Sequence, residues 1–185
     1  MRGKNRLLLL AVLLAASTPL AAWQQRPIPP TAEARIVRQV RHEILMLPYF
    51  GVFDYIAFKV EGYNVTLLGQ VTRPVLKAEA ERAVKNIEGV EKVDNRIEVL
   101  PLSGFDDEVR IRVYRAIYGY PALSRYALPP VKPIRILVNG GHVTLEGVVD
   151  STGDRDAAAI RARTVPGVFS VDNHLVVDRP ALRKK

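Results

Sequence analysis

Two short stretches of sequence decide the fold because each occurs twice. Val65–Val71 (VTLLGQV) returns as Val143–Val149 (VTLEGVV), and Gly89–Asn95 (GVEKVDN) returns as Gly167–Asn173 (GVFSVDN). Both pairs are separated by the same offset of 78 residues, and 12 of the 35 positions in 65–99 are identical in 143–177. An ungapped repeat of this length is typical of a duplication, so the chain is predicted to contain two copies of one folding unit.

Each copy is predicted to fold in the order helix, strand, strand, helix, strand, from the periods of its apolar residues and from its turn residues. In the first copy we expect a helix over 31–47, strands over 53–60 and 65–71, a helix that begins at Pro74 and ends at Gly89, and a strand over 93–99. In the second we expect a helix over 106–118 capped by Asp106 or Asp107, strands over 134–138 and 142–149 around Asn139-Gly140-Gly141, and a helix that ends at Gly167.

This order predicts an α+β fold of two tandem small α-β-β-α-β units. Each unit is expected to be a three-stranded mixed sheet with two helices packed on one face, its second and third strands parallel through a right-handed crossover. Units of about 70 residues are near the lower limit for independent stability, so the two should pack on one another. The second copy carries a proline-rich insert over 119–133 that the first lacks.

The repeated motifs resemble those of the BON domain, a family of bacterial envelope modules. Gly69, Gly89, Val90, Val93 and Asn95 carry the resemblance in the first copy, and Gly147, Gly167, Val168, Val171 and Asn173 carry it in the second. The predicted domains are therefore a first BON-like domain over 33–101 and a second over 105–178, with a short segment over 23–32 and a basic tail over 179–185. The resemblance implies a non-enzymatic module that attaches to phospholipid membranes or supports envelope integrity.

The first residues have the layout of a secretory signal peptide over 1–22. Three basic residues (Arg2, Lys4 and Arg6) precede the apolar run 7–16, and small residues follow over 17–22. The run is too short for a comfortable membrane-spanning helix of about 20 residues. Cleavage and a periplasmic location are therefore predicted, with an uncleaved N-terminal anchor as the alternative. Export also makes nucleic acid an unsuitable partner for this chain.

The composition gives no support for catalysis or for a cofactor. The 185 residues include no cysteine, which excludes disulfide scaffolds, thiol nucleophiles, zinc–thiolate sites and iron–sulfur clusters. His42, His142 and His174 show no metal-ligand spacing. No catalytic residue, no metal and no cofactor is predicted. We interpret Gly69, Gly89, Gly147 and Gly167 as structural glycines, and Asp94-Asn95 and Asp172-Asn173 as turns stabilised by side-chain-to-backbone bonds.

The most distinctive surface is predicted around the first helix of the second copy. Residues 109–135 contain six basic residues, four tyrosines and no acidic residue. A helical projection sets Arg110, Arg112, Tyr114, Arg115 and Tyr118 opposite the apolar stripe, as a face for anionic phospholipid. In the alternative, Tyr114 and Tyr118 pack against the first copy. Another envelope protein and a homo-oligomer are the remaining partner hypotheses. The aromatic cluster over 49–58 is expected to serve core or inter-copy packing rather than a ligand pocket.

Overall fold

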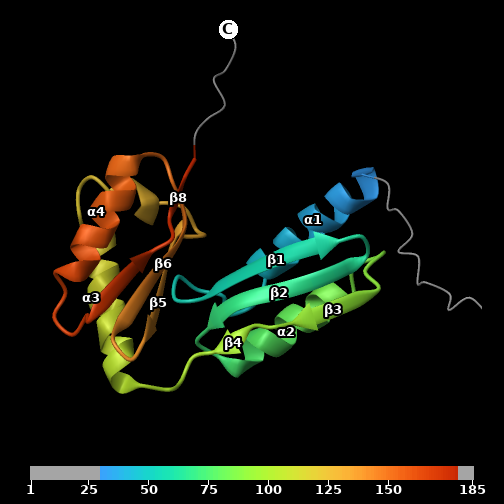
Figure 1. Ribbon diagram of the computed structural model, residues 1–185, viewed down its shortest axis with the longest axis horizontal. Coiled ribbons are helices and arrows are strands. Elements are labelled where there is room, and N and C mark those ends of the chain that lie inside the picture. Colours follow the sequence, from blue (N-terminus) through green and yellow to red (C-terminus); the bar gives the residue numbers. More distant parts are fainter. Residues whose placement is uncertain (1–29, 179–185) are drawn as a thin grey trace, which may run out of the picture.

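Two copies of the same unit follow one another in the structure, a computed structural model that describes residues 30–178 (Figure 1). The predicted signal peptide, residues 23–29 and the tail 179–185 lie outside the described residues. The first unit contains α1 (Pro30–Leu45), β1 (Tyr55–Glu61), β2 (Asn64–Val71), α2 (Pro74–Lys85), β3 (Lys92–Asn95) and β4 (Glu98–Val99). The second contains α3 (Gly104–Tyr118), the 3-10 helix η1 (Ser124–Ala127), β5 (Ile134–Asn139), β6 (His142–Val149), α4 (Thr152–Arg163), β7 (Ser170–Asn173) and β8 (Val176–Val177).

The predicted mixed sheet is confirmed in both units. In the first, β2 pairs antiparallel with β1 and parallel with β3 and β4, and in the second β6 takes the same central place between β5 and β7 with β8. The third strand of each unit is broken into two short pieces. An asparagine causes the break: Asn95 accepts a hydrogen bond from Ile97 N at 3.2 Å and donates to Lys77 O at 2.9 Å. Asn173 makes the same pair of bonds in the second unit.

Each unit has its own apolar core between its sheet and its two helices. Ile36 of α1, Leu76 of α2 and Leu67 of β2 are fully buried together in the first unit. The second core is built in the same way from α3, α4, β5 and β6. Because each fully buried aliphatic side chain stabilises the fold by about 1.5–3 kcal/mol, these cores supply most of the driving force for folding.

Gly69 and Gly147 are required by the close approach of neighbouring backbone. Gly69 has φ +117°, and a Cβ atom there would lie 2.1 Å from Tyr55 O. Gly147 has φ +121°, and its Cβ would lie 1.9 Å from Pro133 O. Both positions lie in the middle strand where the first strand of the unit begins. Gly89 and Gly167 do not end helices as predicted: α2 ends at Lys85 and α4 at Arg163, and each glycine occupies the turn before the next strand.

The segment between α1 and β1 joins the two units. Ile136 N of the edge strand β5 donates to Val52 O at 2.9 Å, and Arg135 Nη1 donates to Gly51 O at 2.6 Å. Val52 and Phe53 also pack against the core of the second unit. Part of the predicted aromatic cluster therefore packs between the copies, and the units contact each other as their small size requires.

Candidate functional site

The start of α3 is fixed by Ser103, not by the aspartates that the sequence suggested as caps. Ser103 is the N-cap residue, and its side chain accepts from Asp106 N at 3.2 Å. Asp106 is instead buried and accepts from Gly140 N at 2.9 Å and from Gly141 N at 2.8 Å. This carboxylate ties α3 to the turn between β5 and β6, and so sets which face of the helix is exposed.

Two of the five predicted binding residues are buried, so the expectation that they share an exposed face is wrong. Arg110 is 4% exposed, donates to Val138 O at 2.7 Å and is bonded to Asp107. Tyr118 is 5% exposed and donates its hydroxyl to Ile134 O at 2.6 Å. Burial of the phenol raises the pKa of Tyr118 far above its usual value, so the hydroxyl remains a donor. Both side chains bind α3 to β5 inside the second unit.

Tyr114 lies at the junction of the two units. It is half-buried, and its ring meets Phe53 of the first unit edge-on at 6.3 Å between centroids. It also contacts Tyr118, with ring centroids 4.8 Å apart. An edge-to-face aromatic pair contributes about 0.5–1.5 kcal/mol beyond the area it buries. The alternative interpretation, in which Tyr114 packs against the first copy, therefore describes its contacts.

Arg112 and Arg115 remain on the exposed side of α3, together with two apolar side chains. Ile111 and Phe105 are each 45% exposed, and Arg115 is exposed one turn after Ile111. Arg112 pairs with Glu108 at 3.4 Å, whereas Arg115 makes no ion pair with any residue in 30–178. We call Phe105, Ile111, Arg112 and Arg115 the α3 face. It combines apolar and cationic groups at the surface.

A shallow apolar cleft adjoins the α3 face. It is lined by Ile111 and Tyr114 of α3, Val52 and Phe53 of the first unit, and Lys132 of the insert. Its one charged lining residue, Lys132, is cationic. The insert thereby adds a third positive charge to the neighbourhood of Ile111. The sequence signal for this arrangement is the absence of acidic residues from 109–135.

The proline-rich insert is a structured part of the second unit. Its residues Leu123 and Tyr126 are buried in the core, on either side of the start of η1. Tyr126 donates its hydroxyl to the buried carboxylate of Asp154 at 3.1 Å, and Arg125 donates to the same carboxylate at 2.5 Å. Ser151 also donates to it at 2.6 Å. Burial alone would raise the pKa of Asp154, but these donors and the Arg125 charge hold it below its usual value.

Replacing Asp154 by Asn should therefore make stability less dependent on pH. A carboxyl group whose pKa is lower in the folded state stabilises the fold above its unfolded pKa, and this contribution disappears as the pH falls below about 4. We expect Asp154→Asn to cost about 2 kcal/mol at pH 7 and less at pH 3, since charged hydrogen bonds contribute about 1.5–3 kcal/mol each. Urea unfolding at the two pH values measures the difference. An equal loss at both would contradict the assignment.

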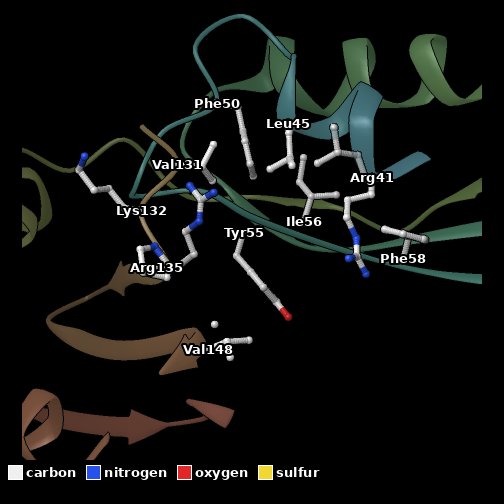
Figure 2. Close-up of a pocket in the computed structure, with 13 residues that line it drawn as sticks. Arg41, Leu45, Phe50, Tyr55, Ile56, Phe58, Val131, Lys132, Arg135 and Val148 are labelled. Carbon is white, nitrogen blue, oxygen red and sulfur yellow. The ribbon is translucent and has the colours of Figure 1, made fainter. Parts of the chain in front are cut away.

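A second, mostly apolar cleft lies between the two units (Figure 2). Its volume is about 350 Å³. The first unit contributes Arg41, Ile44, Leu45, Phe50, Tyr55, Ile56 and Phe58, and the second contributes Val131, Lys132, Pro133, Arg135, Gly147 and Val148. Phe50, Tyr55 and Phe58 belong to the aromatic cluster that was expected to serve packing rather than a pocket, so that expectation is wrong for these three residues. The sequence did not show the cleft because its walls belong to different units and depend on how the units pack together.

The described residues offer no group of side chains suited to hold a metal ion. His174 Nδ1 lies 2.8 Å from Glu146 and His142 Nδ1 lies 2.8 Å from Ser170 Oγ, each as an isolated pair across neighbouring strands. Within 30–178, no helix is both long enough and apolar enough to cross a membrane. The features that stand out are the α3 face, the cleft beside it and the cleft between the two units.

The family model for the BON domain matches residues 32–101 and 122–179, which is more than half of the chain. The chain belongs to the BON domain family. The match occurs once in each unit, so this is a tandem two-BON-domain protein. BON domains are envelope- or membrane-associated binding modules and are generally not catalytic. The second matched segment begins after α3, so the family match itself does not include the α3 face.

Comparison with solved structures finds two that describe CdsD, a structural protein of the type III secretion system of Chlamydia trachomatis. The first is 14% identical, covers 78% of this chain and 92% of its own, and superposes with a TM-score of 0.29. The second, a C-terminal domain, is 12% identical, covers 78% of this chain and 98% of its own, with a TM-score of 0.28. No curated protein matches this chain.

Proposed function

We propose that this protein is a periplasmic, non-enzymatic module that attaches to anionic phospholipid surfaces through the α3 face of its second BON domain and supports envelope integrity. One observation carries the proposal: exposed apolar side chains, the exposed Arg115 and the partly exposed Arg112 lie together on α3, beside an apolar cleft whose one charged lining residue is a lysine. In this proposal residues 1–22 act as the export signal. Arg110 and Tyr118, which are buried, position the helix rather than touch lipid.

The chemistry of the α3 face suits the boundary between headgroups and acyl chains. Ile111 and Phe105 supply apolar surface for the acyl boundary. Arg112 and Arg115 each supply a guanidinium group that can donate two hydrogen bonds to one phosphate. Each basic residue near an anionic surface contributes roughly 1 kcal/mol. Glu108 and Asp107 on the same helix reduce the net charge, so the attachment is expected to be weak, reversible and sensitive to salt.

Reversing the two arginines should abolish this attachment. The double variant Arg112→Glu/Arg115→Glu replaces two attractive charges by two repulsive ones, so binding to anionic vesicles should fall at least about 30-fold. The measurement is co-sedimentation of residues 23–185, which retain every described residue, with phosphatidylglycerol-containing and with pure phosphatidylcholine vesicles at low and moderate salt. The wild type should bind only the anionic vesicles, and less at the higher salt.

Arg38→Glu/Lys85→Glu on α1 and α2 is the matched control, because it makes the same change in net charge on exposed basic residues of the first unit that line neither cleft. This control should retain most of the vesicle binding. Equal losses in both double variants would show that net charge, not the α3 face, governs attachment. Absence of binding by the wild type, with oligomers that form without lipid, would favour the alternative of a protein-assembly module.

A further inference from the structure

The cleft between the two units has the composition of a site for a small amphipathic anion. Ile44 and Leu45 of α1 and Phe58 of β1 supply apolar lining from the first unit, and Val131 and Val148 supply it from the second. Figure 2 shows side chains from both units around this space. Its volume of about 350 Å³ is in the range of small-molecule sites, which are mostly apolar with a few polar groups.

All three charged residues that line the cleft are cations, namely Arg41, Lys132 and Arg135. Two carboxylates lie close enough to influence the lining: Asp54 acts on Arg135 and Glu146 acts on Tyr55. Neither lines the cleft or forms an ion pair with Arg135, so the two negative charges only partly offset the three cations. Asp54 accepts from Thr72 N at 2.7 Å and from Gly51 N at 2.9 Å, and Glu146 pairs with His174. The cleft therefore keeps an excess of positive charge.

Arg135 is a buried cation without an ion-paired carboxylate in the described part of the chain. It is 8% exposed, its guanidinium stacks over the Phe50 ring at 4.6 Å, and Gly51 O is the only acceptor bonded to it within 30–178. None of the described carboxylates forms an ion pair with it. Burial of a cation without a counter-charge is costly, and it lowers the pKa of Arg135 without removing the charge. An anion in the cleft would supply the missing partner.

The two segments that flank the described residues have basic side chains. Segments 1–29 and 179–185, outside the described residues, contain no acidic side chain, and both carry basic residues. Charge complementarity therefore points to an external molecule that combines an anionic head with an apolar body.

We propose that the cleft between the BON domains binds a single-chain anionic amphiphile, with its carboxylate or phosphate head at Arg135 and its alkyl chain between Leu45, Phe58 and Val148. This site is separate from the α3 face, and it does not depend on the function proposed for that face. The head replaces the missing counter-charge of Arg135, and the chain buries apolar surface that is otherwise in contact with water.

Calorimetric titration of residues 23–185 tests this site without vesicles. The probes are decanoate and decyl phosphate, with uncharged decanol and cationic decyltrimethylammonium for comparison, each below the concentration at which it forms micelles. We expect the two anions to bind at least tenfold more tightly than decanol and the cation not to bind. Dodecanoate should bind about fourfold more tightly than decanoate for each added CH2 that enters the cleft. Equal binding of decanoate and decanol would overturn the proposal.

A matched pair of variants locates the binding. Val148→Asp places a carboxylate in the cleft and should reduce decanoate binding at least tenfold. Val176→Asp is the control, because Val176 is the exposed register partner of Val148 on β8 and does not line the cleft. Arg135→Met should also lose the preference for anions over decanol, and circular dichroism checks that each variant is folded.

Two further results distinguish binding in the cleft from vesicle attachment and from dimer formation. Arg112→Glu/Arg115→Glu should leave decanoate binding unchanged, so a failure of vesicle attachment and a failure of this site are distinguishable. If Val148→Asp and Val176→Asp bind decanoate equally, or if the wild type forms a dimer that only Val148→Asp dissociates, then a small anion is not the occupant and the proposal is overturned.

Discussion

Gly147→Ala is expected to destabilise the second BON domain by about 4 kcal/mol, the largest loss expected for a Gly→Ala change within residues 30–178. Two costs combine at this position. The backbone has φ +121°, which L residues rarely adopt, and the new Cβ would lie 1.9 Å from Pro133 O. Relief of the clash requires β5 and β6 to separate where Ile134 pairs with Gly147. Urea unfolding followed by circular dichroism measures the loss.

Gly140→Ala is the control that separates the close approach from the backbone conformation. Gly140 also has positive φ, +58°, but a Cβ there meets no atom within 4 Å. We therefore expect a loss of about 1–2 kcal/mol, the ordinary cost of a left-handed L residue. Equal losses of stability in the two variants would show that the backbone conformation, and not the close contact with Pro133 O, requires glycine at position 147. Gly69→Ala should repeat the larger effect in the first unit, because its Cβ would lie 2.1 Å from Tyr55 O.

The repeat made most of the fold predictable from sequence. Two copies of one pattern gave two independent indications of each element, and the strands around Gly69 and Gly147 could be aligned by their offset alone. The family resemblance followed from the same motifs and is confirmed by the family model. The broken third strand was less visible, because its cause is an asparagine side chain that bonds to a helix carbonyl 18 residues earlier.

Which side chains of α3 are exposed could not be predicted from the sequence. A helical projection separates the core stripe from the rest of the helix, but it does not show that a segment of another unit covers part of the remainder. Val52 and Phe53 pack against the second core and cover the side that bears Tyr114. Arginines are usually exposed, but Arg110 is buried and its guanidinium donates to Val138 O. Arg115, which is exposed, and Arg112, which is partly exposed, lie beyond these contacts.

The N-cap residue of α3 could have been predicted from the sequence. Ser103 stands three residues before Asp106, a spacing typical of helix starts in which the first residue caps and the fourth is acidic. The structure uses Ser103 in this role and frees Asp106 for another. The two roles have different energetic consequences, because a cap acts at the surface of one helix and a buried carboxylate holds two elements together.

Asp106→Ala is accordingly expected to cost about 3 kcal/mol, and Ser103→Ala about 1 kcal/mol. Removing the Asp106 carboxylate leaves the buried Gly141 N and the partly buried Gly140 N without their acceptor, and a buried donor without a partner costs about 1–3 kcal/mol. Removing the Ser103 hydroxyl loses one capping bond, which is typically worth about 1 kcal/mol. Urea unfolding of the two variants compares the losses directly.

Hydrogen exchange distinguishes the two roles even if the total losses are similar. In Asp106→Ala the amides of Gly140 and Gly141 should exchange faster than the neighbouring strand amides, because the turn between β5 and β6 opens locally without the carboxylate. In Ser103→Ala those two amides should be unaffected, and the faster exchange should appear at Asp106 N in the first turn of α3. If Gly140 and Gly141 remain protected in Asp106→Ala, then the carboxylate does not hold the hairpin to α3, and the orientation of the α3 face must depend on Arg110 and Tyr118 instead.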